Sequence, residues 1–166
     1  MKLPKWPDPI GFRDIKFGLD RVKKLLERLK NPHHNLPPTI HVSGTNGKGS
    51  TISYIKQILT EAGYKTHCYT SPHLIEFNER IILANQKISD EFLDEISFEC
   101  QKSAQAEPEI PITFFEGVTV MAFLAFARIK ADVLLLEVGM GGRLDATNVI
   151  TNPLATIISS LIYFYL

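Results

Sequence analysis

A glycine-rich stretch with one lysine and two hydroxyls offers the clearest chemistry in the chain. Residues 39–51 read Thr-Ile-His-Val-Ser-Gly-Thr-Asn-Gly-Lys-Gly-Ser-Thr. The order predicts a short strand, a loop and a helix, an arrangement that cradles phosphates because glycines let backbone N–H groups converge on an anion. The start of the helix adds unpaired N–H donors. We expect Lys48 to reach the terminal phosphates of a nucleoside triphosphate and the Ser50 hydroxyl to ligate Mg²⁺.

The spacing of this stretch differs from the common phosphate-binding loop, which has four residues between its first glycine and Gly-Lys. Here only Thr45 and Asn46 separate Gly44 from Gly47. Gly49 also lies between the lysine and the hydroxyl residues. A plain strand–turn–helix connection is therefore the alternative interpretation of this stretch when it is taken alone.

Glu137 ends a fully apolar run, residues 133–136, which has the length of a strand. Such a run is typical of a central parallel strand that is covered on both faces. The carboxyl ends of parallel strands share one edge of a sheet, so we expect Glu137 to lie beside the glycine loop, where an acid could hold Mg²⁺ on a nucleotide. The alternative is an ion-paired or helix-capping carboxylate.

Ser71 and His73 follow a predicted strand over residues 65–69 and should lie at the same edge. The Ser71 hydroxyl could complete the Mg²⁺ shell, or it could simply begin a turn before Pro72. His73 is more typical of a hydrogen-bonding loop histidine than of a metal ligand or a base.

Asp145 and the phenylalanines Phe114 and Phe115 are weaker candidates. The carboxylate of Asp145 could bind the polar edge of a ligand or close an Asx turn. The two rings are most simply core residues, although one of them could stack on a flat heterocycle.

Bulk properties limit the class of protein. The chain has 166 residues, 45% of them hydrophobic, and a formal net charge of zero, which fits one domain with a buried core and does not indicate a nucleic-acid surface. Two distant cysteines fit a reducing compartment. The start of the chain has no signal-peptide pattern, and no apolar run approaches a membrane span. We expect a cytoplasmic protein that binds neither nucleic acid nor a membrane.

Helical and strand patterns alternate along the chain, which predicts an α/β fold with an open, mostly parallel sheet and ligands at the carboxyl ends of its strands. Residues 1–38 are predicted to form an N-terminal helix and linker, and residues 39–166 an ATP-binding central domain that is incomplete. Helices are expected over 17–30, 48–62, 89–106 and 113–129, and strands over 40–42, 65–69, 80–83, 87–88, 133–137 and 154–158.

Five segments carry a resemblance to a known family: residues 17–22, 42–51, 70–81, 113–116 and 136–148. Their types, order and spacing together resemble the folylpolyglutamate synthase/dihydrofolate synthase family, within the Mur-ligase superfamily. The resemblance extends to about Ser159. It also accounts for the unusual glycine loop, because Gly-Thr-Asn-Gly-Lys-Gly-Ser is similar to the version that this family uses.

The resemblance implies an ATP-dependent ligase that adds L-glutamate to dihydropteroate or tetrahydrofolate. The substrate carboxylate would attack the γ-phosphate of ATP, and the glutamate amine would displace phosphate from the resulting acyl phosphate. Lys48 and Glu137 would be the catalytic residues, with ATP and Mg²⁺ as cofactors. By position, the phosphates would be held by Gly47, Lys48, Gly49 and Ser50, and the metal by Ser71, Glu137 and Ser50.

The same resemblance implies a pterin pocket, with Phe115 as the stacking ring and Arg80 in a mobile loop over the site. The expected substrate-binding residues are Thr113, Phe114, Phe115, Glu116, Leu144, Asp145, Ala146 and Arg80. The partners would be small molecules, namely a pteroate or folate, L-glutamate and ATP. The full-length family is expected to be monomeric.

The resemblance stops before the family's second metal-binding histidine, its adenine contacts and its C-terminal domain. The expectation is therefore a partial Mur-ligase-type ATPase domain without the C-terminal domain, with an exposed apolar edge on its sheet. One alternative is an inactive or ATP-binding remnant that needs a separately encoded second half. Another is a Mur-type peptide ligase of cell-wall synthesis, which the segments at residues 113–116 and 143–148 disfavour. The purified chain is expected to show no glutamate ligation.

Overall fold

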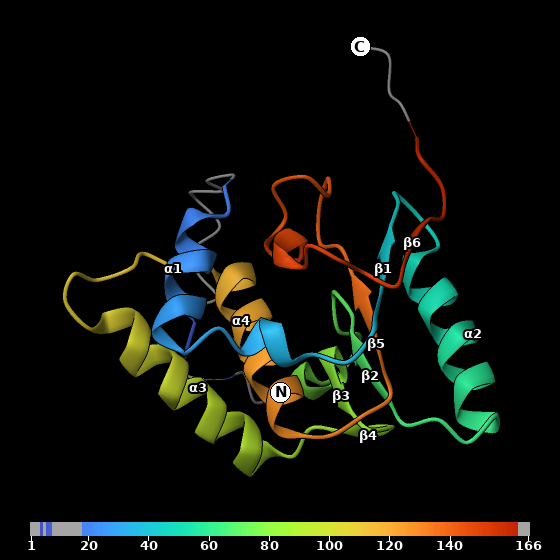
Figure 1. The fold of residues 1–166 in the computed structure, drawn as a ribbon, viewed down its shortest axis with the longest axis horizontal. Helices are drawn as coiled ribbons and strands as arrows, with labels where there is room; N and C mark the ends of the chain where they lie inside the picture. The colour runs from blue at the N-terminus through green and yellow to red at the C-terminus, as the bar shows by residue number, and fades with distance from the viewer. Residues whose placement is uncertain (1–3, 5, 8–17, 163–166) are drawn as a thin grey trace.

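The computed structural model describes Pro4, Trp6, Pro7 and residues 18–162. A central sheet separates helices that cover its two faces (Figure 1). In chain order the elements are α1 (Asp20–Arg28), η1 (Pro32–Asn35), β1 (Thr39–Ser43), α2 (Lys48–Glu61), β2 (Thr66–Tyr69), η2 (Phe77–Arg80), β3 (Ile81–Leu83), β4 (Gln86–Lys87), α3 (Asp90–Gln105), α4 (Phe114–Arg128), β5 (Val133–Glu137), η3 (Ala146–Val149) and β6 (Ala155–Ile158). The η elements are 3₁₀-helices.

The sheet has six strands in the order β4-β3-β2-β5-β1-β6. Strands β2, β5, β1 and β6 run parallel, whereas β3 and β4 add an antiparallel edge. The apolar strand β5 lies between β2 and β1, and its residues 134–136 have no exposed surface. The predicted open and mostly parallel α/β sheet is therefore confirmed.

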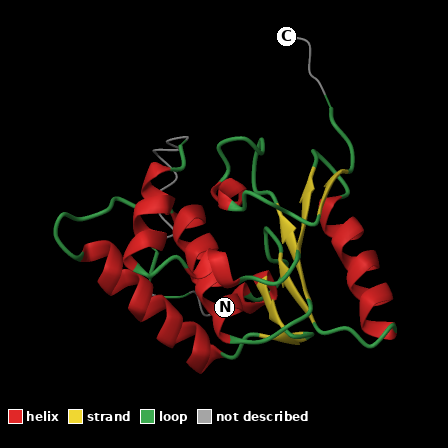
Figure 2. Cartoon of the chain, in the orientation of Figure 1, coloured by secondary structure: helices red, strands yellow, loops and turns green. Residues whose placement is uncertain are grey.

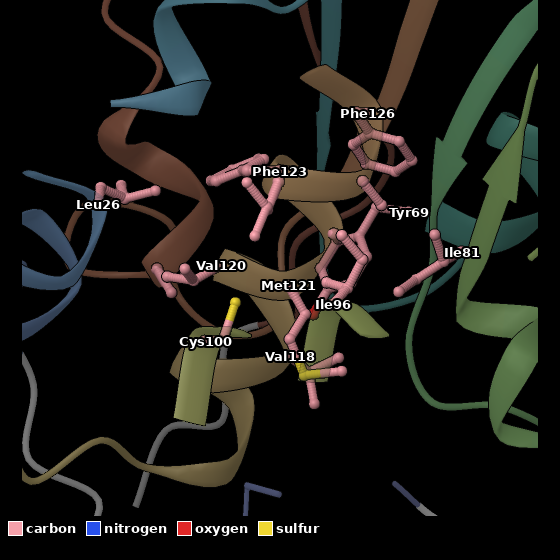
Figure 3. Close-up of a cluster of buried hydrophobic side chains, with 14 of the residues drawn as sticks. Leu26, Tyr69, Ile81, Ile96, Cys100, Val118, Val120, Met121, Phe123 and Phe126 are labelled. Carbon is pink, nitrogen blue, oxygen red and sulfur yellow. The ribbon is translucent and has the colours of Figure 1, made fainter. Parts of the chain in front are cut away.

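The two faces of the sheet are covered unequally. Helices α1, α3 and α4 lie on one face, and α2 lies on the other (Figure 2). The larger core cluster lies on the side of the three helices, where α4 contributes a nearly continuous buried surface (Figure 3). A smaller cluster, centred on Val42, Ile52, Cys68 and Leu135, joins α2 to the sheet. Full burial of one such apolar side chain stabilises a fold by about 1.5–3 kcal/mol.

Capping residues mark the start of α3 and the end of α2. Ser89 accepts a hydrogen bond from the backbone N–H of Phe92 at the start of α3. Gly63 follows the end of α2 with φ at 87°, a left-handed conformation that favours glycine. The helix predicted over residues 48–62 is one residue shorter in the structure, because α2 ends at Glu61, and Ala62 is exposed.

Helix α1 packs into the same core as α3 and α4, through Val22, Leu25 and Leu26. Its predicted start at Phe17 lies outside the described residues, and the proposed domain boundary at residue 38 stays a prediction. Within the described part of the chain, no helix is long and apolar enough to cross a membrane.

Candidate functional site

The glycine loop joins β1 to α2 at the carboxyl end of the parallel strands. Gly44 and Gly47 have φ angles of 145° and 79°, in the region that side chains disfavour. Gly47 is the residue that caps the start of α2. The loop therefore has the backbone that the sequence predicted, with the first N–H groups of a helix free at its end.

The chain after β6 lies directly against this loop. A Cβ atom on Gly44 would be 2.2 Å from the hydroxyl of Ser159, so only glycine fits there without a shift. Ser159 Oγ donates to the carbonyl of Asn46 at 2.6 Å, and the N–H of Thr45 donates to the carbonyl of Ser160 at 2.6 Å. Sequence interpretation missed this support, because no local pattern indicates a contact across more than a hundred residues.

Lys48 points back across the loop. Its Nζ donates to the carbonyl of Gly44 at 3.0 Å and lies 3.9 Å from Oε1 of Glu137. Ser50 lies in the first turn of α2 and is exposed. The lysine charge thus lies between the loop and the carboxylate at the end of β5, and the predicted position of Glu137 beside the glycine loop is confirmed.

Glu137 is only 4% exposed. Strand pairing places it opposite Val42, two residues before Gly44, and its Oε2 accepts the backbone N–H of Ser71 at 2.9 Å. Burial raises the pKa of Glu137, whereas the Ser71 N–H and the charges of Lys48 and Arg80 oppose that rise. A cation beside the carboxylate would favour its ionised form. The structure therefore brings Lys48, Ser71 and Glu137 together.

The donors at this edge fit a hard cation. A carboxylate and two hydroxyls, from Glu137, Ser71 and Ser50, are oxygen ligands of the kind that Mg²⁺ uses alongside water and nucleotide phosphates. Across the described residues, no group of three or more His, Cys, Asp or Glu side chains is placed to hold a metal.

Phe115 and the loop after β5 adjoin each other. A Cβ atom on Gly139 would lie 2.3 Å from Cζ of Phe115, so the ring packs directly on the glycine backbone. The Phe115 ring centroid is 6.2 Å from that of Tyr69. In the same loop Leu144 is 47% exposed, whereas Asp145 and Ala146 are buried. Two of the predicted pterin-binding segments are thus neighbours.

The carboxylate of Asp145 is engaged within its own loop. It accepts the backbone N–H groups of Met140 and Thr147 at 2.8 and 3.0 Å. The Thr147 hydroxyl donates to it at 2.6 Å, so this hydroxyl accepts from Nε2 of His41 at 2.8 Å. The Asx-turn interpretation of Asp145 is therefore correct, and its contact with a substrate stays a prediction.

Glu116 and Thr113 form a capping box at the start of α4. The Glu116 carboxylate also pairs with the Arg21 guanidinium, at 3.1 Å from Nε and 2.7 Å from Nη2. Both oxygens of Glu116 thus join α1 to α4. These contacts are structural, and a contact of Thr113, Phe114 or Glu116 with a substrate stays a prediction.

Arg80 lies at the end of an ordered element. The resemblance implied a position in a mobile loop, and the structure places Arg80 as the last residue of the 3₁₀-helix η2, only 7% exposed. Burial is possible because the rings of Phe77 and Phe114 cover the guanidinium. His73 accepts a hydrogen bond from Arg80 Nε at 2.9 Å, which confirms the interpretation of His73 as a hydrogen-bonding histidine.

Known proteins are similar to this chain in both sequence and structure, although no family model matches it. The chain is 41% identical over 155 residues to the dihydrofolate synthase/folylpolyglutamate synthase of Haemophilus influenzae, covering 89% of this chain and 33% of that protein. The chain matches the N-terminal portion of the folylpolyglutamate/dihydrofolate synthase family. It spans about a third of the length of the curated relatives that it matches.

Solved structures of these synthases are similar to the chain in fold as well. Escherichia coli FolC in complex with DHPP and ADP superposes with a TM-score of 0.84 at 34% identity, covering 95% of this chain and 37% of that chain. The bifunctional synthase of Yersinia pestis, complexed with AMPPNP and a Mn ion, superposes with a TM-score of 0.80 at 37% identity, covering 90% and 35%. At 34% and 37% identity, the likeness to these structures extends beyond the fold to related sequence.

Proposed function

We propose that this chain provides the nucleotide- and metal-binding part of an ATP-dependent ligase that joins L-glutamate to dihydropteroate or tetrahydrofolate. The observation that carries the proposal is the convergence of Lys48, Glu137 and Ser71 beside the glycine loop. Similarity to the synthase family supports the class of reaction, and the family's ATP-analogue and manganese complexes support the nucleotide and the metal.

The reaction would bring together two anions, a substrate carboxylate and the γ-phosphate of ATP, before an acyl phosphate forms. The ammonium group of Lys48 and the N–H groups of the glycine loop would offset this repulsion. A magnesium ion held by Glu137, Ser71 and Ser50 would supply further positive charge on the phosphates. Such a cation would also favour the ionised form of the buried Glu137 carboxylate.

On the substrate side, Phe115 would stack on the pterin and the loop at Leu144–Ala146 would form the pocket wall. The proposed cellular location is the cytoplasm, because both described cysteines, Cys68 and Cys100, are buried and unpaired. The proposed partners are the small-molecule substrates, with a monomeric state in the full-length family.

Binding of nucleotide to the purified chain tests the proposal. Isothermal titration with MgATP should show binding that Lys48→Ala weakens by about 10- to 100-fold, the usual effect of removing a charge-assisted contact. Lys56→Ala is the matched control, since it removes the same charge from α2 about 12 Å further along the helix axis. The control should bind MgATP as the wild type does.

Equal affinities for the wild type and Lys48→Ala would contradict the role of the loop. A second assay addresses the reaction itself, by measuring phosphate release that depends on ATP, pteroate and glutamate together. Release would establish a ligase, whereas MgATP binding without release would favour a chain that only binds the nucleotide.

A further inference from the structure

Arg80 is a buried cation that no carboxylate neutralises. It is 7% exposed, and within the described part of the chain no carboxylate oxygen lies within 4.0 Å of its guanidinium. The guanidinium carbon lies 5.6 Å from the ring centroid of Phe77 and 5.7 Å from that of Phe114. Aromatic rings attract a cation but cannot replace an anionic partner. A buried charge of this kind indicates a place for an anionic ligand.

His73 controls which nitrogens of Arg80 remain available. Arg80 Nε donates to Nδ1 of His73 at 2.9 Å, so His73 acts as the acceptor in this bond. Among the described residues, no hydrogen bond is formed by the two terminal nitrogens of Arg80. The histidine thus takes the single Nε–H donor, and this bond constrains the orientation of the guanidinium plane. The terminal pair, which can bind two carboxylate oxygens at once, is left free.

Backbone contacts place this cation at the same sheet edge as Glu137. The N–H of Thr70 donates to the carbonyl of Arg80 at 3.1 Å, and the next residue, Ser71, donates its N–H to Glu137. The charge of Arg80 lowers the pKa of Glu137, although burial outweighs it. Phe114 brings the start of α4 to the same place. The free side of Arg80 is therefore near both the proposed metal ligand and the proposed pterin pocket.

We propose that His73 is a positioning residue, which holds Arg80 so that its terminal nitrogens bind the carboxylate of a pteroate. This inference rests on the proposed function and adds the part of the substrate that Arg80 would contact. A guanidinium suits this role because its planar fork matches a carboxylate with two parallel hydrogen bonds. A lysine in its place would keep the charge but lose the fork.

Substitutions at His73 test the positioning role. In His73→Asn the side-chain oxygen is as many bonds from the backbone as Nδ1, so it can accept from Arg80 Nε. His73→Ala removes the acceptor, and His73→Gln places its oxygen one bond too far. Titration of the full chain with pteroic acid, in the presence of MgADP, should show affinity lowered about tenfold by His73→Ala. His73→Asn should restore the affinity to within about threefold, and His73→Gln should not.

Two further measurements make the result decisive. The affinity for MgADP alone should stay within about twofold of the wild type in every His73 variant. The ¹⁵N–¹H signal of Arg80 Nε should exchange slowly with water in the wild type and in His73→Asn, and quickly in His73→Ala. This signal reports the hydrogen bond without any ligand.

Several outcomes would overturn the proposal. Equal losses in His73→Ala and His73→Asn, with equal losses of stability in urea, would show that His73 only packs. Weaker MgADP binding with normal pteroic acid binding would assign Arg80 to a phosphate instead. A wild-type chain that binds MgADP but no pteroic acid would remove the carboxylate site and leave the nucleotide site intact. A chain that binds no nucleotide would contradict the proposed function separately.

Discussion

At the scale of single residues, burial determines how Glu137 behaves. Its carboxylate is 4% exposed and lies 3.9 Å from the Lys48 ammonium, so its charge is only partly offset inside the protein. We expect Glu137→Gln to remove the effect of Mg²⁺ on ATP binding, because the amide keeps the shape but loses the charge that a metal needs. Wild-type affinity should fall about 10- to 100-fold when EDTA removes the metal, and the variant should show little change.

Titration calorimetry with and without EDTA measures this difference, with Glu61→Gln as the control on the exposed end of α2. The unfolding midpoint of Glu137→Gln in urea should be close to that of the wild type, because the amide keeps the shape of the side chain and an oxygen that can accept the Ser71 N–H. A variant that keeps the full metal effect would exclude Glu137 as a ligand.

Gly139 illustrates a residue whose importance depends on a contact. Gly139→Ala would place a methyl group 2.3 Å from Phe115 Cζ, so the ring or the loop must move. We expect a loss of about 1–3 kcal/mol in the free energy of unfolding, which is typical of overpacking. Urea denaturation measures it. The double variant Gly139→Ala with Phe115→Leu should recover part of the loss, and purely additive effects would show that the two residues do not interact.

Residue types and spacing were enough to predict Lys48, Glu137 and Ser71 as neighbours. This prediction succeeds because all three residues lie at or just after the carboxyl ends of parallel strands, and these ends share one edge of the sheet. The burial of Arg80 and the contact between Phe115 and Gly139 could not be predicted, since both depend on how loops fold over the start of α4. No sequence pattern indicates that the rings of Phe77 and Phe114 cover the Arg80 guanidinium, because Phe114 is distant from Arg80 in the sequence.

At the scale of elements, His67 links β2 to two other segments. Its Nδ1 accepts the N–H of Ala84 at 3.1 Å, and its Nε2 donates to the carbonyl of Ile129 at 2.9 Å. This pattern requires the neutral ring, and burial lowers the pKa of His67 below its usual 6.5. Burial also lowers the pKa of His41, and that of His33 to about 4.

These three histidines should make the protein less stable in mild acid. Each has a lower pKa in the folded state than in the unfolded state, so the unfolded chain binds more protons between the two values. Their contribution is therefore complete above about pH 6.5 and is lost as the pH falls through 6 and 5. Urea denaturation between pH 7.5 and 5 should show a falling free energy of unfolding.

His67→Leu isolates one part of this effect. At pH 7.5 the variant should be less stable by about 2 kcal/mol, because it leaves the Ala84 N–H and the Ile129 carbonyl without their partner. The difference from the wild type should narrow toward pH 5. Two parallel pH curves would contradict a neutral, hydrogen-bonded His67 in the folded protein.

Element boundaries were predictable where a cap marks them, as at Ser89, Thr113 and Gly63. The boundaries of the short 3₁₀-helix η2 were not predictable. The sequence predicted a loop where the 3₁₀-helix η2 forms, because its capping Glu76 and Glu79 resemble an ordinary polar turn. Local patterns also did not predict which helix covers which face of the sheet, because helices on both faces have apolar residues directed at the sheet.

At the scale of the whole molecule, the unequal layers leave apolar surface on one side. Strand β6 forms an edge of the sheet. Leu154, which directly precedes β6, and Ile158, its last residue, are 66% and 65% exposed. On α2, Tyr54 and Ile58 are 74% and 68% exposed. The exposed apolar edge that the sequence predicted is thus confirmed in the described part of the chain. Edge strands with apolar side chains invite pairing with another chain.

The β6 edge should therefore make the purified chain associate with itself. Ile158→Lys places a charge on the edge, where it disfavours strand pairing, and we expect it to reduce concentration-dependent association by at least several-fold. Gln105→Lys adds the same charge at the exposed end of α3, on the opposite layer, and should change nothing. Sedimentation velocity over a hundredfold range of concentration distinguishes the variants. Association that persists equally in Ile158→Lys would show that surfaces other than β6 carry it, with the exposed face of α2 the next to substitute.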